Sequence, residues 1–306
     1  MSGEWSEEEM VSRIADILRG PAPSSDEVHI GDDAAVLKGF VGQAVISTDV
    51  AVWGVHLDAE LFTLEDFGYK AFTSAVSDLA AMGAWARGAV IGVSSSPGTD
   101  LEMLHRGIAE ASLYTGCPVV GGDLTSGTGV SVAVTVFGEC PEGSAVLRSG
   151  AKPGDTLLVT GPLGASAAGR RLRSAGAPVS DELVQAHCRP VPRLREGLLA
   201  RWAGVHAMMD LSDGLGLDLH RMADASGVGF SLDNVPVAKG ATLDEAMSGG
   251  EDYELLIATD KPNELIVNFV EDGRRPLLVI GQVLDDESVR TLRGQPFEKR
   301  GWQHQL

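Results

Sequence analysis

At residues 148–155 the chain reads Arg-Ser-Gly-Ala-Lys-Pro-Gly-Asp. The polar residues, two glycines and one proline of this stretch are typical of a turn-rich connection between elements. A chain of 306 residues is long enough for two domains of about 150 residues each. We therefore predict an N-terminal domain over residues 1–147 and a C-terminal domain over residues 148–306.

Apolar periodicity predicts a mixture of helices and strands on both sides of this stretch. In the first half we expect helices over 6–19, 64–82 and 101–114, and strands over 43–48, 89–93, 118–120 and 130–138. In the second half we expect helices over 165–175, 191–202, 214–226 and 262–272, and strands over 156–160, 229–232, 254–259 and 277–280. The predicted fold class is therefore α/β with α+β character in two domains.

The composition excludes several classes of function. A net charge of −19 argues against nucleic acid and against an anionic membrane surface as partners. The three cysteines include no C-x-x-C pair, so neither a disulfide framework nor a zinc site is indicated. We find no apolar signal segment and no run of 18 apolar residues. These observations predict a cytoplasmic protein.

The common nucleotide-binding motifs are absent from the sequence. There is no Gly-Lys dipeptide, which excludes a P-loop, and no G-x-G-x-x-G, which excludes the Rossmann fingerprint. The kinase motifs H-R-D and D-F-G are missing too. Any phosphate chemistry in this chain must be organised by other residues.

Aspartates next to glycine, serine or threonine recur at five places along the chain. The motifs are Gly31-Asp32-Asp33, Ser47-Thr48-Asp49, Ser77-Asp78, Gly121-Gly122-Asp123 and Asp210-Leu211-Ser212-Asp213-Gly214. Carboxylate and hydroxyl oxygens are hard ligands suited to Mg²⁺, and the glycines allow close approach. Each motif taken alone is also explained by a turn, a strand end or a helix cap.

Asp78 is the hardest of these to explain as a structural residue. It lies within a predicted helix among apolar neighbours such as Val76 and Leu79. An unpaired carboxylate there would be costly to bury, so a cation or a donor partner is required. Its position favours a metal site.

Two further segments have the character of ligand contacts. Gly249-Gly250-Glu251-Asp252 places a double glycine and an acidic pair just before an apolar strand. A polar hairpin turn explains the same pattern. His56 follows Gly54 in an apolar run, where a lone histidine is more often a core or surface residue.

Eight segments, in this order, resemble the superfamily of aminoimidazole-ribonucleotide synthetase-like ATP enzymes and, within it, the thiamine-monophosphate kinase family. They read GDDAAVL, STDVAVWGVH, SDLAAMGA, VGGDLTSG, LRSGAKPGD, VTGPLGASAAG, DLSDGL and SGGEDYELL. The resemblance implies a two-domain fold of synthetase type whose N-terminal sheet forms the interface of a homodimer. It also implies that ATP and several Mg²⁺ ions bind between the domains, and that the ATP γ-phosphoryl group passes to thiamine monophosphate.

The resemblance assigns roles to particular residues of this chain. The positions that match metal ligands of the family are Asp32, Asp33, Ser47, Thr48, Asp49, Asp78, Asp123, Asp210 and Asp213. Gly122, Asp123, Arg148 and Ser212 match nucleotide contacts, although an exposed linker arginine also explains Arg148. His56, Glu251 or Asp252, and Trp302 match the region that holds thiamine phosphate.

The chemistry explains why an acidic site could bind phosphates. Two unit charges ~4 Å apart repel by ~4 kcal/mol at an effective dielectric constant of ~20. Several Mg²⁺ ions would remove that repulsion and bridge donor and acceptor. We assign no catalytic base, because the attacking phosphate oxygen is already ionised. The alternatives are a purine-pathway synthetase and a non-catalytic, metal-stabilised scaffold of the same fold.

Overall fold

The computed structural model describes residues 6–20, 27–30 and 34–303. It divides into two compact units, and the chain passes from the first to the second between Pro141 and Glu142. Residues Ala80–Ala84 pack with the second unit. The boundary that we predict between residues 147 and 148 lies a few residues further along the chain.

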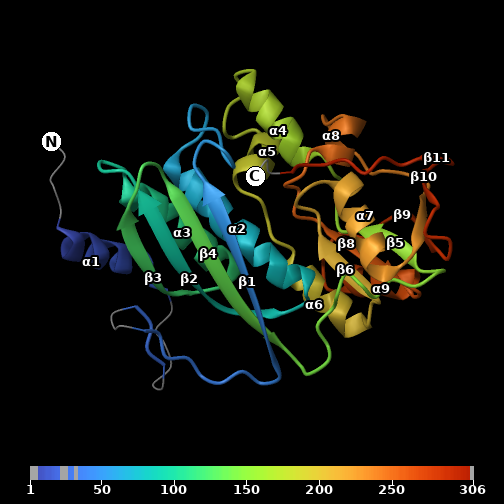
Figure 1. The fold of residues 1–306 in the computed structure, drawn as a ribbon, viewed down its shortest axis with the longest axis horizontal. Helices are drawn as coiled ribbons and strands as arrows, with labels where there is room; N and C mark the ends of the chain where they lie inside the picture. The colour runs from blue at the N-terminus through green and yellow to red at the C-terminus, as the bar shows by residue number, and fades with distance from the viewer. Residues whose placement is uncertain (1–5, 21–26, 31–33, 304–306) are drawn as a thin grey trace. The chain divides into compact units, whose positions relative to one another are not determined.

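The first unit contains a four-stranded sheet with the strand order β1-β4-β2-β3 (Figure 1). Strands β1, β4 and β2 are antiparallel neighbours, whereas β3 runs parallel to β2 at the edge. The elements are α1 (Glu7–Ile17), β1 (Gln43–Val52), α2 (Leu64–Ala81), β2 (Trp85–Ser95), α3 (Leu101–Thr115), β3 (Val119–Ser126) and β4 (Ser131–Cys140).

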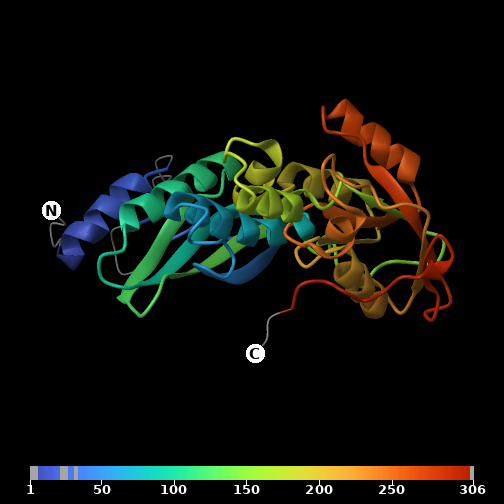
Figure 2. The same cartoon turned by 90° about the horizontal axis from the view of Figure 1, so that it is seen from above.

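Two glycines bring helices α2 and α3 into backbone contact. A Cβ atom on Gly107 would lie 1.8 Å from the carbonyl oxygen of Glu65, and one on Gly68 would lie 2.1 Å from that of Leu104. Figure 2 shows α1 and α3 on one side of the sheet. Strand alternation therefore turns one row of β1 side chains toward the helices and the other row away from them.

The second unit contains a seven-stranded sheet in the order β11-β10-β7-β9-β5-β8-β6. Its strands are β5 (Thr156–Val159), β6 (Ala207–Asp210), β7 (Gly229–Leu232), β8 (Leu255–Thr259), β9 (Leu278–Leu284), β10 (Arg290–Leu292) and β11 (Gln295–Pro296). Its helices are α4 (Ala165–Ser174), α5 (Glu182–Cys188), α6 (Leu194–Ala203), α7 (Leu215–Ser226), α8 (Leu243–Ser248) and α9 (Pro262–Glu271).

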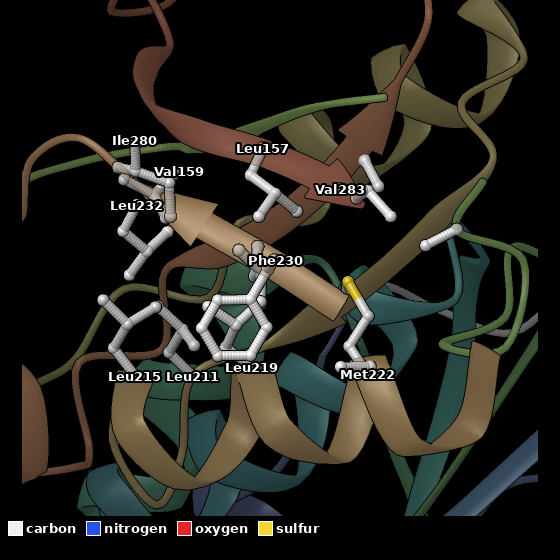
Figure 3. Close-up of a cluster of buried hydrophobic side chains, with 14 of the residues drawn as sticks. Leu157, Val159, Leu211, Leu215, Leu219, Met222, Phe230, Leu232, Ile280 and Val283 are labelled. Carbon is white, nitrogen blue, oxygen red and sulfur yellow. The ribbon is translucent and has the colours of Figure 1, made fainter. Parts of the chain in front are cut away.

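The main core of this unit lies between α7 and the sheet (Figure 3). Leu219 and Met222 of α7 face Phe230 of β7, and all three side chains are almost fully buried. Their spacing of three residues puts both helix side chains on one face. This packing holds α7 on the sheet, and the predicted site residues Ser212 and Asp213 lie just before that helix.

Most of the predicted elements are confirmed, and two of the strands that carry predicted site residues are longer than expected. β1 continues to Val52 and β3 to Ser126, so Asp49 and Asp123 lie inside strands rather than after them. We did not predict α5, α8, β6, β10 or β11, which are short elements with little periodicity of their own. No helix in the described part of the chain combines the length and apolar character that crossing a bilayer requires.

Candidate active site

In the first unit, Ser47 and Asp78 meet where β1 passes over α2. The Ser47 hydroxyl donates to the Asp78 carboxylate at 2.5 Å. Asp49 lies two residues further along β1 and shares the helix-facing side of the strand with Ser47. The donor that the position of Asp78 required is thus a serine hydroxyl. Ser47, Asp49 and Asp78 thus place three hard, oxygen-bearing side chains on the helix-facing side of the sheet.

Thr48 and Asp123 do not join this group within the unit. The Thr48 hydroxyl lies on the other face of β1 and hydrogen-bonds Thr135 on β4 at 2.9 Å. The register aligns Asp49 with Gly122 across β4 and β2, which places Asp123 one residue further, in line with Val50. Three strand spacings separate β1 from β3, about 14 Å.

Gly122 allows β3 to approach β2 closely. A Cβ atom at this position would lie 2.2 Å from the carbonyl oxygen of Ile91. Asp32 and Asp33 lie outside the described residues. Within the described ranges, no three His, Cys, Asp or Glu side chains are grouped closely enough to hold a metal ion.

His56 lies in a turn that directly follows β1. Its Nδ1 accepts the backbone N–H of Val52 at 2.9 Å, and its carbonyl oxygen accepts from the Lys70 ammonium group at 3.1 Å. The same Nδ1 lies 3.4 Å from the carbonyl oxygen of Val52, so the imidazole is held against the end of β1. The turn and α2 together fix the position of this histidine.

In the second unit, Asp210 ends β6 and Asp213 lies in the loop before α7. Neither Ser212 nor Asp213 caps α7. Instead, the carboxylate of Asp218 accepts the backbone N–H groups of Asp213 at 2.9 Å and Gly214 at 3.1 Å. Arg221 forms ion pairs with both Asp213 and Asp218.

Burial dominates the ionisation of Asp218. It raises the pKa of this carboxyl to about 6, although the hydrogen bond from Asp213 N–H and the charge of Arg221 act in the opposite direction. The group therefore holds the loop through hydrogen bonds in a dry environment.

The acidic loop, residues 249–254 just before β8, lies against the loop that contains Ser212. The backbone N–H of Glu251 donates to the carbonyl oxygen of Ser212 at 2.7 Å, and that of Tyr253 donates to Leu211 at 3.0 Å. A Cβ atom on Gly250 would lie 2.7 Å from the same Ser212 oxygen. The double glycine of the motif thus permits close contact between the two loops.

Trp302 lies beside the same pair of loops. Its backbone N–H donates to the carbonyl oxygen of Asp213 at 2.9 Å. A Cβ atom on Gly301 would lie 2.4 Å from that oxygen. Asp210, Ser212, Asp213, Glu251 and Trp302 therefore form one neighbourhood, although they come from three distant parts of the sequence.

Arg148 lies in an exposed loop of the second unit. Its carbonyl oxygen accepts from the Ser226 hydroxyl at 3.0 Å, which ties the loop to the C-terminal end of α7. The backbone is thus held, and the exposed side chain is accessible to a ligand.

The sequence does not predict two sets of polar contacts that support the acidic loop. Arg193 donates two hydrogen bonds to the Glu254 carboxylate, at 2.8 and 2.6 Å. The Ser166 hydroxyl lies 3.0 Å from Nδ1 of His187, which in turn lies 3.6 Å from the Glu251 carboxylate. Ser166 and His187 are 21 residues apart, and Arg193 and Glu254 are 61 residues apart, so no local pattern pointed to these partners.

Two family models match the chain. The model described as AIR synthase related protein, N-terminal domain, matches residues 31–140, and the corresponding C-terminal domain model matches residues 152–292. Together they cover most of both units.

The chain is also similar to curated proteins and solved structures. The thiamine-monophosphate kinase of Salmonella typhimurium is 36% identical over 327 aligned positions, covering 99% of this chain and 98% of that protein. The Mycobacterium tuberculosis protein of the same name is 34% identical, covering 94% and 86%. The Stenotrophomonas maltophilia thiamine-monophosphate kinase structure has a TM-score of 0.82 at 29% identity, covering 96% and 97%. AaThiL complexed with AMPPCP and TMP has a TM-score of 0.77 at 27% identity, covering 99% and 98%.

Proposed function

We infer that this chain, which belongs to the thiamine-monophosphate kinase family of AIR synthase related proteins, transfers the γ-phosphoryl group of ATP to thiamine monophosphate. The products are thiamine diphosphate and ADP. The observation that carries this function is the similarity to thiamine-monophosphate kinases along nearly the whole length of both chains.

The oxygen-bearing side chains of both units fit Mg²⁺. In the first unit, Ser47, Asp49 and Asp78 offer hard oxygens on one side of β1. In the second unit, Asp210 and Asp213 lie at the two ends of one short loop. We assign these residues as metal ligands, and we assign Asp32, Asp33, Thr48 and Asp123 from the family resemblance alone, since Thr48 and Asp123 lie apart from the Ser47 group. When bound, the ions would neutralise the phosphate charges and serve as Lewis acids.

The remaining assigned residues would bind and orient the two substrates. Arg148 is exposed and carries a planar guanidinium that suits a phosphate group, so we assign it to ATP together with Gly122 and Ser212. His56, whose Nδ1 is held at the end of β1, can contact a phosphate oxygen through its Nε2. We assign His56, Glu251 and Trp302 to thiamine monophosphate, and we place the reaction in the cytoplasm.

The activity is tested directly with purified protein, Mg²⁺ and ATP. We expect ADP release that depends on thiamine monophosphate, with stoichiometric thiamine diphosphate detected by chromatography. Free thiamine lacks the phosphate oxygen that attacks ATP, so it should give no more ADP than a reaction without acceptor. Equal ADP release with and without thiamine monophosphate would contradict the assignment.

We also propose that the protein is a homodimer that pairs through the open face of the first sheet. Ile46 is 67% exposed and Val50 is 58% exposed, and strand alternation puts both on the side of β1 opposite Ser47 and Asp49. Val90 of β2 is partly exposed and lies in register with Thr48 on that face. A second copy would cover this apolar surface.

Light scattering coupled to size-exclusion chromatography tests the dimer. We expect the mass of two chains for the wild type and of one chain for Ile46→Asp, because a buried carboxylate without a partner opposes association. Val41→Asp is the control, since Val41 is exposed but precedes the sheet. It should leave the mass unchanged. A wild type with the mass of one chain at micromolar concentration would refute the proposal.

A further inference from the structure

Asp252 differs from its neighbour Glu251 in what its carboxylate contacts. It accepts the backbone N–H of Gly164 at 2.7 Å and that of Ser166 at 3.2 Å. Both groups belong to the first turn of α4 (Ala165–Ser174), whose own N-cap residue, Gly164, has no side chain to contribute. Asp252 thus caps a helix that begins 88 residues earlier in the chain.

The electrostatics of this cap suit an acidic residue. The first turn of α4 contains no acidic residue, and its last turn carries Arg171 and Arg173. A carboxylate at the N-terminus of a helix is stabilised by the N–H groups and by the helix dipole. The carboxyl is also removed from water, and this burial raises its pKa to about 7 despite the opposing backbone hydrogen bonds.

The backbone on both sides of Asp252 is strained. Glu251 has φ of 58° and Tyr253 has φ of 50°, although neither is glycine. Such left-handed residues persist only where the surrounding structure holds them in place. The restraints here are the Asp252 cap, the two N–H bonds to Ser212 and Leu211, and the ion pair between Glu254 and Arg193.

We propose that Asp252 is a positioning residue that caps α4 and thereby holds Glu251 and the Ser212 loop in place for thiamine monophosphate, and that it does not itself bind the substrate. This inference rests on the proposed function for the identity of the ligand. The tight packing of the loop supports it: a Cβ atom on Gly249 would lie 2.4 Å from Cβ of Ala167 on α4. Movement of α4 would therefore be transmitted directly to the acidic loop.

Two substitutions separate the cap from the charge. Asp252→Ala removes both, whereas Asp252→Asn removes the charge and keeps one of the two oxygen acceptors that Gly164 and Ser166 use. We expect the alanine variant to raise KM for thiamine monophosphate about fivefold, because substrate binding must then reorder a loop that has lost one cap. KM for ATP should change by less, and the asparagine variant, which keeps one acceptor, should recover part of the loss.

A control variant and a second measurement make the test specific. Asp100→Ala also removes an aspartate cap, from α3 in the first unit, where Asp100 accepts the N–H of Met103. It should lower the thermal stability without changing KM for thiamine monophosphate. Hydrogen exchange of the amides of residues 164–166 and 251–253 needs no substrate. Protection there should fall in Asp252→Ala and fall less in Asp252→Asn.

Each outcome decides the proposal. If Asp252→Asn loses as much activity as Asp252→Ala while its amides stay protected, the charge of Asp252 acts on a ligand and the proposal is wrong. Unchanged amide protection in Asp252→Ala also overturns it. If the alanine variant does not fold, Asp252→Ser, with a shorter acceptor, takes its place. If the wild type leaves thiamine monophosphate unchanged, the proposed function fails, and hydrogen exchange still decides whether Asp252 caps α4.

Discussion

Asp49→Asn is expected to lower kcat for phosphorylation of thiamine monophosphate by on the order of 10²–10³-fold, as loss of an electrostatic group at the reacting phosphates does elsewhere. The substitution preserves the shape of the side chain and removes the charge that would hold Mg²⁺. Asp49 lies on the same side of β1 as Ser47, whose hydroxyl meets Asp78. Neutralising one member of this group should weaken the metal site and leave β1 in place.

The measurement is steady-state ADP release at increasing Mg²⁺ concentration. The asparagine variant should need more Mg²⁺ to reach its lower maximal rate, because the site has lost a negative ligand. Circular dichroism should show an unchanged fold. The matched control is Asp16→Asn in α1, where the carboxylate is exposed and pairs only with nearby Arg19 in the described structure. An Asp49→Asn variant with wild-type activity and Mg²⁺ dependence would remove Asp49 from the site.

Gly107→Ala is expected to destabilise the first unit strongly. In an ordinary helix the same change would stabilise by up to about 1 kcal/mol. Here the new Cβ atom would lie 1.8 Å from the backbone oxygen of Glu65 on α2. A backbone atom cannot rotate away, so the two helices must separate. We expect a net loss of about 2–3 kcal/mol in the free energy of unfolding.

Chemical denaturation followed by circular dichroism measures this loss. Gly129→Ala is the control, since a Cβ atom there would meet nothing within 4 Å. The control should unfold at nearly the wild-type denaturant concentration. The packing argument would be wrong if Gly107→Ala unfolded at or above the wild-type midpoint. Because α2 carries Asp78, a destabilised Gly107→Ala protein should also lose kinase activity on mild warming.

The sequence supported the fold class and most of the element order. The apolar pattern of residues 64–82 predicted the helix α2 (Leu64–Ala81), because amphipathic periodicity is a local property of the chain. Glycine and serine around Asp78 and Asp213 also indicated a site for hard cations. The ordered motifs pointed to the thiamine-monophosphate kinase family, to which the chain belongs.

The lengths of the site strands could not be predicted in the same way. Glycines 121 and 122 suggested a turn, yet both lie in β3, where Gly122 permits the approach of Ile91. A glycine required by a neighbouring strand is indistinguishable, in sequence, from one required by a turn. The position of Asp123 at the edge of the sheet, away from Asp49, followed only from the register.

By itself, the sequence predicted which residues carry the chemistry: aspartates, hydroxyls and the glycines beside them. Only the tertiary structure decided how they are partnered. Ser47 reaches Asp78 across 31 residues, and Asp252 reaches the start of α4 across 88. The physical reason is that a carboxylate finds its partner through space, whereas sequence patterns report only contacts within a turn or two of the chain. Glu251 and Asp252 are adjacent in sequence and alike in chemistry, and the fold alone distinguishes their contacts.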